Sequence, residues 1–175
     1  TILWMSSDYN THIATVSQTV LPRGITKKRR AAKKELPDIK RSRTHFLLNN
    51  DQSSALDAIG MASPGTVILH GITGSGKTAI YIEYARKILA GGKSVIMLVP
   101  EIALTSQLVA EFQQHFSEII LTHSRQTEAE RHLCWQEAAS SDTPRVIIGP
   151  RSALFLPLHS VGAIIVDEAH EPSFK

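Results

Sequence analysis

Residues 66–78 have the sequence TVILHGITGSGKT, in which an apolar run leads directly into a glycine-rich loop. The run 66–70 has the composition of a buried strand. The loop matches the pattern G-x-x-x-x-G-K-[ST], in which glycines let backbone N–H groups point at phosphate oxygens. Lys77 is then placed to reach the β and γ phosphates, and the hydroxyl of Thr78 to ligate Mg²⁺. The residues expected to hold ATP here are Gly71, Ile72, Thr73, Gly74, Ser75, Gly76, Lys77 and Thr78.

A pair of acids ends a second apolar run, in residues 163–170, AIIVDEAH. We expect Asp167 to hold Mg²⁺, directly or through water, and Glu168 to orient and deprotonate the attacking water. His170 is expected to hydrogen-bond toward a second half of the enzyme and to report the state of the nucleotide. An acidic helix cap would contain similar residues, but the phosphate loop about ninety residues upstream favours a nucleotide hydrolase.

Short apolar runs alternate with helical stretches along the rest of the sequence. Strands are predicted at 66–70, 94–99, 119–121, 145–149 and 163–166, and helices at 79–90, after Thr105 and at 128–139. Phe112 and Phe116 recur at helical spacing and are predicted to belong to the core. Unalternating strands separated by helices predict an α/β fold with a parallel sheet covered on both faces. Ligands of such sheets bind at the carboxyl ends of the strands, where both motifs fall.

Charge divides the chain into three regions. Residues 1–22 are mixed and β-leaning, and they are too few to fold alone, so we expect them to be the tail of an upstream domain. Residues 23–43 contain ten Lys or Arg against Glu35 and Asp38, a balance of +8, whereas the predicted domain at 44–175 has a balance of −4. Such a basic linker either lies along a phosphate backbone or is a plain charged spacer, and composition leaves both open.

The composition excludes several classes of protein. A hydrophobic share of 42% is typical of a folded soluble chain. No run approaches the eighteen or so apolar residues that a membrane span needs. The single cysteine, Cys134, has no internal disulfide partner and is expected to be a buried small hydrophobe. These features favour a cytoplasmic protein without a membrane partner, and the absence of an initiator Met suggests a fragment of a longer chain.

The motifs together resemble the primosomal replication-restart helicases, a family of superfamily 2 DNA helicases. The phosphate loop and D-E-x-H on one parallel sheet resemble the first motor domain of that superfamily. Six further stretches resemble the restart family in order, over about residues 45–175: LNNDQ at 48–52, LVPEIALT at 98–105, THS at 122–124, Glu130-Arg131 with Trp135, GPRSALF at 149–155 and PSFK at 172–175.

The resemblance implies a RecA-like three-layer fold and an ATP-driven helicase that moves 3′ to 5′ on DNA at stalled or abandoned forks. It also implies that residues 1–22 are the tail of an upstream DNA-binding region. It implies that Gln52 contacts adenine, and that primosome proteins and single-strand-binding protein are partners. It also implies zinc, held by cysteines in a later segment outside this chain. The residues expected along the DNA strand are Thr105, Ser124, Arg151 and Ser152. Capping of a helix remains an alternative role for Thr105, as does pairing with a surface acid for Arg151.

Three positions depart from the family pattern. Pro150 stands where the family more often has Thr, Ala169 where it more often has Glu, and Arg125 where it usually has Gly. None removes a catalytic group, but Pro150 lacks a backbone donor beside the expected DNA path. Two alternative functions stay open: another superfamily 2 motor acting on DNA or RNA, and a nucleotide-gated DNA-binding module that does not hydrolyse ATP.

Overall fold

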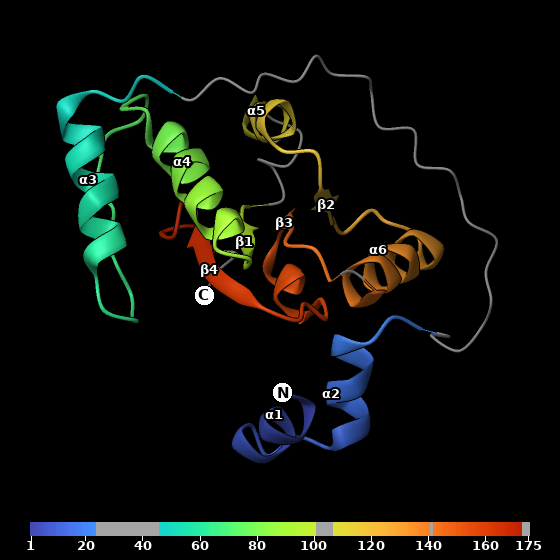
Figure 1. Cartoon of the computed structure of the whole chain (residues 1–175). Coiled ribbons are helices and arrows are strands. Elements are labelled where there is room, and N and C mark those ends of the chain that lie inside the picture. The colour runs from blue at the N-terminus through green and yellow to red at the C-terminus, as the bar shows by residue number, and fades with distance from the viewer. Residues whose placement is uncertain (24–45, 101–106, 141, 173–175) are drawn as a thin grey trace.

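A four-stranded parallel sheet forms the centre of the computed structural model, which describes residues 1–23, 46–100, 107–140 and 142–172. The strands lie in the order β2-β3-β1-β4 (Figure 1). Their bounds are Ser94–Leu98 for β1, Ile119–Leu121 for β2, Val146–Gly149 for β3 and Val161–Val166 for β4. All three strand pairs are parallel. These four strands confirm the predictions for their segments, and the sheet matches a RecA-like α/β domain.

Helices cover both faces of this sheet, as the sequence predicts. Helices α4 (Lys77–Ala90) and α5 (Gln107–His115) pack on one face, and α6 (Glu128–Ser140) lies on the other with the 3₁₀ helix η2 (Arg151–Phe155). Figure 1 shows α4 and α6 on different sides of β1 and β3. Three predicted helices are therefore confirmed. The predicted cap of α5, Thr105, lies outside the described residues.

The core has two parts, one on each face of the sheet. Phe112 is fully buried and Phe116 nearly so, and their ring centroids lie 5.7 Å apart against the α4 side of the sheet. Their prediction as core residues is confirmed. Cys134 is buried in the smaller cluster on the α6 side, which confirms its prediction as a small hydrophobe.

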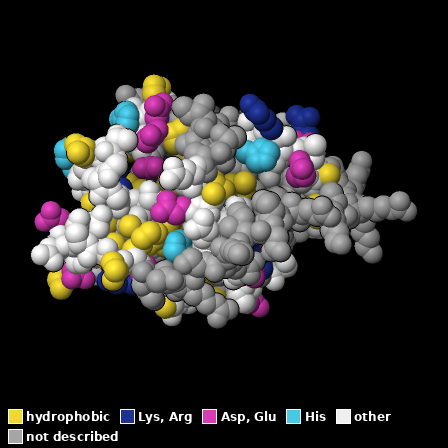
Figure 2. Space-filling view, turned by 90° about the horizontal axis from the view of Figure 1, so that it is seen from above, with side chains coloured by type: hydrophobic (Ala, Val, Ile, Leu, Met, Phe, Trp, Pro, Cys, Tyr) yellow, Lys and Arg dark blue, Asp and Glu magenta, His cyan; other side chains and the backbone are white. Residues whose placement is uncertain are grey.

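The predicted strand at 66–70 is wrong. No strand is assigned there, and Val67 and Ile68 are 49% and 87% exposed. A strand forms only where its backbone groups find a partner, and among the described residues β4 is the last strand on its side of the sheet. Ile164 of β4 is itself 52% exposed. Hydrophobic side chains therefore reach the surface in several places (Figure 2).

The N-terminal region is helical rather than β-leaning, which corrects the prediction for 1–22. Helices α1 (Ile2–Asp8) and α2 (Ile13–Val20) pack against each other. The β-branched residues of α2 favour strands only weakly, and two local features stabilise a helix instead. The His12 side chain accepts a hydrogen bond from the Ala14 N–H at 3.2 Å, and Val16 is buried.

The chain after α2 lies against the N-terminal end of α6. Pro22 is buried, and the backbone N–H of Arg23 donates to Oε2 of Glu128 at 3.2 Å. Of the predicted basic linker 23–43, all but Arg23 lies outside the described residues. At Phe46 the described chain resumes, where its N–H donates to the buried carboxylate of Glu83 at 3.1 Å.

Helix α3 (Asn50–Met61) was not foreseen, although a local signal for it exists. Asn49 and Gln52 form a capping box: the Gln52 N–H donates to Oδ1 of Asn49 at 2.8 Å, and the Asn49 N–H donates to Oε1 of Gln52 at 3.0 Å. Helix η2 is likewise an addition to the expected elements. None of the helices described has the length and apolar character needed to cross a bilayer.

Candidate nucleotide and DNA site

The phosphate loop lies immediately before α4 and is closed on itself. The ammonium group of Lys77 donates to the carbonyl oxygens of Gly71 at 2.8 Å and Ile72 at 2.9 Å. Gly74 and Gly76 both have φ near +81°, a conformation that favours glycine. Phosphate oxygens are stronger acceptors for an ammonium than carbonyl oxygens are, so this lysine would exchange its loop contacts for a bound nucleotide.

Gln52 lies beside this loop. Its side-chain amide donates to the carbonyl oxygen of Ser75 at 3.1 Å, while its amide oxygen completes the cap of α3. A Cβ atom on Gly76 would collide with the same amide group. Gln52 therefore links α3 to the phosphate loop, and its contact with adenine stays a prediction.

The D-E-A-H segment is brought to α4 by a tyrosine. Asp167 follows β4, and its N–H donates to the carbonyl oxygen of Leu98 at 3.0 Å. The hydroxyl of Tyr81 donates to Oδ1 of Asp167 at 3.2 Å. Because Tyr81 stands one turn after Lys77, the helix that begins at the phosphate loop also contacts the predicted Mg²⁺ ligand.

Burial raises the pKa of Tyr81, and the neighbouring Asp167 carboxylate raises it further. The phenol therefore keeps its proton at neutral pH and remains a donor to that carboxylate. Sequence reasoning missed Tyr81. The available signal was its position four residues after Lys77, on the same face of α4.

Glu168 is held in an uncommon backbone conformation. Its φ is +49°, in the left-handed region that side chains other than glycine seldom adopt. The turn is closed by the N–H of Glu171, which donates to the carbonyl oxygen of Glu168 at 2.8 Å. Such strain costs on the order of 1–3 kcal/mol and is concentrated at functional sites. Glu168 and His170 are both exposed, so both are accessible to water or a ligand.

The residues around Lys77 fit Mg²⁺ bound together with a nucleotide. Mg²⁺ keeps several waters and is usually held by one or two carboxylates plus substrate phosphates. Within the part of the chain that the structure describes, no group of three or more His, Cys, Asp or Glu is placed to hold a metal by protein ligands alone. Thr78 at the start of α4 and Asp167 at the end of β4 are consistent with such a shared site.

Two of the four predicted DNA contacts come together. Ser124 follows β2, Ser152 follows β3, and both line one cavity of about 290 Å³ at the carboxyl ends of these strands. Arg151 is exposed at the start of η2, next to Ser152. Thr105 lies outside the described residues.

Comparison with known proteins identifies the family of this chain. The family model described as "DEAD/DEAH box helicase" matches residues 49–175, which include both the phosphate loop and the D-E-A-H segment. The chain belongs to the DEAD/DEAH box helicase family. Lys77 and Thr78 of this helicase domain begin helix α4, and Asp167 and Glu168 directly follow strand β4.

Curated relatives of this helicase domain are replication restart proteins PriA. The protein from Chlamydia trachomatis is 44% identical over 133 residues, which cover 73% of this chain and 18% of the relative. That from Haemophilus influenzae is 45% identical over 130 residues, covering 73% and 18%. The Rickettsia conorii protein is 35% identical over 182 residues, covering 99% and 26%. The chain thus matches about a fifth to a quarter of the length of these relatives.

Proposed function

We propose that this chain is the ATP-binding motor domain of a DNA helicase that acts in replication restart. In this proposal, hydrolysis of MgATP drives 3′ to 5′ movement on DNA at stalled or abandoned forks. The observation that carries it is the contact between Tyr81 and Asp167, which joins the phosphate-loop helix to the D-E-A-H segment. The helix that begins at the phosphate loop therefore contacts the D-E-A-H segment, which supports the proposal.

Each residue of the proposed site has a separate role. Lys77 binds the β and γ phosphates, while Thr78 and Asp167 hold Mg²⁺, which neutralises charge on the phosphates when bound. Glu168 orients a water molecule and accepts its proton. Tyr81 does not touch the reacting atoms. It positions Asp167 by donating to one carboxylate oxygen, which leaves the second oxygen for the ion or its waters.

The DNA side of the proposal rests on the residues after β2 and β3. The hydroxyls of Ser124 and Ser152 suit phosphate oxygens, and these residues line one cavity. Arg151 and Thr105 complete the proposed path. From the family resemblance of the motifs, the proposal includes primosome proteins and single-strand-binding protein as further partners, a cytoplasmic setting, and zinc held by cysteines outside these residues.

Turnover of ATP by the product of the complete reading frame tests this function. We expect forked DNA to raise the rate severalfold, and Glu168→Gln to lower it by a factor of 100 or more, since the water then lacks its base. Glu171→Gln is the matched control, because it removes a carboxylate three residues away. A rate that ignores DNA would contradict the helicase function, while ATP binding without turnover would favour the nucleotide-gated module.

The nature of the nucleic acid distinguishes this function from that of another superfamily 2 motor. We expect unwinding of DNA forks and not of matched RNA forks. The 175-residue chain alone is expected to bind MgATP weakly, to hydrolyse it slowly and to unwind nothing, because such motors take an arginine from a second domain. Brisk DNA-stimulated turnover by the 175 residues would contradict this expectation.

A further inference from the structure

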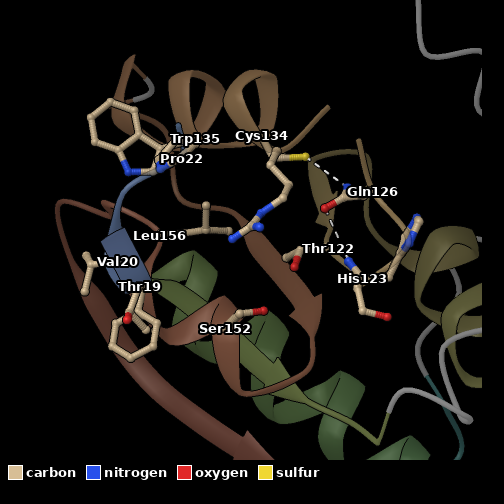
Figure 3. A pocket seen from close by; sticks show the side chains of 13 residues that line it. Thr19, Val20, Pro22, Thr122, His123, Gln126, Cys134, Trp135, Ser152 and Leu156 are labelled. Atoms are coloured by element: carbon tan, nitrogen blue, oxygen red, sulfur yellow. Dashed lines mark hydrogen bonds between the residues drawn. The ribbon is translucent and has the colours of Figure 1, made fainter. Parts of the chain in front are cut away.

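A cavity of about 290 Å³ lies between the N-terminal region and the motor core (Figure 3). Its walls come from the end of α2, from α6, and from the loops that follow β2 and β3. It is distinct from the phosphate loop, none of whose residues line it. Its volume is near the lower end of small-ligand pockets, which span about 300–1,000 Å³.

One wall of this cavity is apolar and includes a flat ring. Trp135 of α6 is half-buried, and Figure 3 shows its indole next to Pro22. Val20 of α2 adds an aliphatic side chain to the same wall. A planar, partly apolar ligand would replace water on these surfaces, and stacking on tryptophan is the contact that proteins commonly make with single nucleic-acid bases.

The cavity also has hydrogen-bond donors and one positive charge, from α6 and from the loops after β2 and β3. Arg131 lines the cavity with its side chain 44% exposed, and a single amino group of its guanidinium pairs with Glu128 at 3.4 Å. An exposed pair of this kind is weak, so the remaining donors can turn to an anion. The hydroxyls of Ser124 and Ser152 lie at the same cavity. One guanidinium with hydroxyls matches a phosphodiester better than it matches a triphosphate.

We propose that this cavity binds one unstacked nucleotide of single-stranded DNA, with its base against Trp135 and its phosphate toward Arg131. The inference rests on the proposed function, since Ser124 and Ser152 are its predicted strand contacts. It adds a base-stacking residue and a second cation to that path. It also gives the N-terminal region a role, because Val20 and Pro22 form part of the base-binding wall.

Glu128 connects this role to the basic region of the chain. Its carboxylate accepts from the Arg23 N–H through one oxygen and pairs with Arg131 through the other. The point at which the ten-cation segment 23–43 begins is therefore fixed next to the guanidinium that would hold the strand.

Photo-cross-linking tests the site directly. Oligothymidylate carrying 5-iodouracil is bound to the product of the complete reading frame, irradiated, and the protein is digested with trypsin. We expect a cross-linked peptide 132–145, modified at Trp135. Strand binding without any adduct on Trp135 would overturn the cavity and leave the helicase function standing. Failure to bind DNA at all would overturn the proposed function itself.

Two substitutions separate stacking from charge. Trp135→Leu should weaken binding of oligothymidylate roughly 5- to 150-fold without changing the slope of log K against log salt. Arg131→Gln should weaken binding and reduce that slope by about 0.7, the amount expected for one phosphate contact on a single strand. If Trp135 and Arg131 only supported the fold, the two substitutions would not differ in their effect on the salt slope.

Controls keep the test independent of folding. Trp4→Leu changes the exposed tryptophan of α1 and should leave affinity and slope unchanged. Trp135→Phe keeps an aromatic face and should retain most of the affinity. Equal thermal stability of the variants excludes misfolding as the cause. Binding by Trp135→Leu at the wild-type level would overturn the proposal.

Discussion

The centre of the sheet and its β4 edge differ sharply in packing. Every residue of β1 and β3 is buried, whereas β4 alternates between exposed and half-buried residues. Yet the β4 edge carries Asp167 and Glu168, and the exposed segment 66–70 leads into the phosphate loop. The most closely packed residues and the residues predicted to carry the chemistry thus lie in different parts of the same sheet.

This difference shows what each region depends on. The centre of the sheet is stabilised by side chains packed together in one buried cluster, such as Phe112 of α5 and Met97 of β1, both fully buried. The β4 edge pairs with β1 along its length but leaves much of its side-chain surface exposed, and the hydrogen bond from Tyr81 to Asp167 joins it to α4. Side chains this exposed at the predicted site are consistent with a site that must rearrange when it binds and releases its ligand.

The largest expected contrast comes from removing one large side chain in each region. Phe112→Ala should lower the free energy of unfolding by about 3–5 kcal/mol, because it leaves a cavity in a close-packed core. Ile68→Ala should change it by less than about 0.5 kcal/mol, since that side chain is 87% exposed. Chemical denaturation of both variants measures this contrast. Equal losses would show that 66–70 is packed after all.

Two glycines give the next contrast. A Cβ on Gly149 would lie 2.9 Å from the backbone oxygen of Thr122, so Gly149→Ala should destabilise the chain by about 1–3 kcal/mol. Gly60 lies in α3 with nothing within 4 Å of the added carbon, so Gly60→Ala should stabilise it by about 0.5–1 kcal/mol. The midpoint of thermal unfolding should fall for Gly149→Ala and rise for Gly60→Ala. A shift of both midpoints in the same direction would contradict this account.

Removing the hydroxyl that joins α4 to β4 should have a smaller effect on stability. Tyr81→Phe should lower the free energy of unfolding by about 1 kcal/mol, the net value of one hydrogen bond. We also expect the Mg²⁺ concentration for half-maximal turnover to rise, because Asp167 is less well positioned. Tyr84→Phe on the same helix is the control and should change neither quantity.

The same tyrosine predicts how stability changes in alkali. Because its folded pKa is raised, the native state keeps the phenol proton while the unfolded chain, with the ordinary value of 10.0, releases it. Stability should therefore fall as pH rises above about 10, and Tyr81→Phe should reduce that fall. Identical alkaline slopes for the wild type and the variant would contradict the assignment.

The smallest expected effect concerns Glu111 on α5. Burial raises the pKa of its carboxyl, so the folded state binds its proton more tightly than the unfolded chain does. Stability that is present below pH 4.5 is then lost as pH rises through the raised pKa. Glu111→Gln should remove this loss. The loss amounts to less than about 0.5 kcal/mol of unfolding free energy, because solvent screens the group. Denaturation at pH 4 and pH 7 measures it.

The sequence predicted the centre of the sheet because its signals are local. Apolar runs of strand length at β1, β2 and β3, and the Gly91-Gly92 pair after α4, determine those elements almost independently of the rest of the chain. The phosphate loop was likewise predictable, since its glycines and Lys77 act through their own backbone.

Elements that depend on distant partners were less predictable. The run 66–70 has strand composition, but whether it is a strand depends on a neighbour that composition does not specify. Helices α1 and α2 contain β-branched residues, and contact between the two helices outweighs that preference. The role of Tyr81 needed the position of Asp167, eighty-six residues away, which only the fold supplies.

The outer edge of β4 has a consequence for handling the protein. Its sequence, VGAIIV, contains no charge and no proline, and no described strand pairs with it on that side. Bare apolar edges of this kind recruit the strands of other molecules and seed insoluble fibres. We expect concentrated solutions of the 175-residue chain to become turbid on storage. The substitution Ile164→Lys, at a side chain that is 52% exposed, should keep such solutions clear.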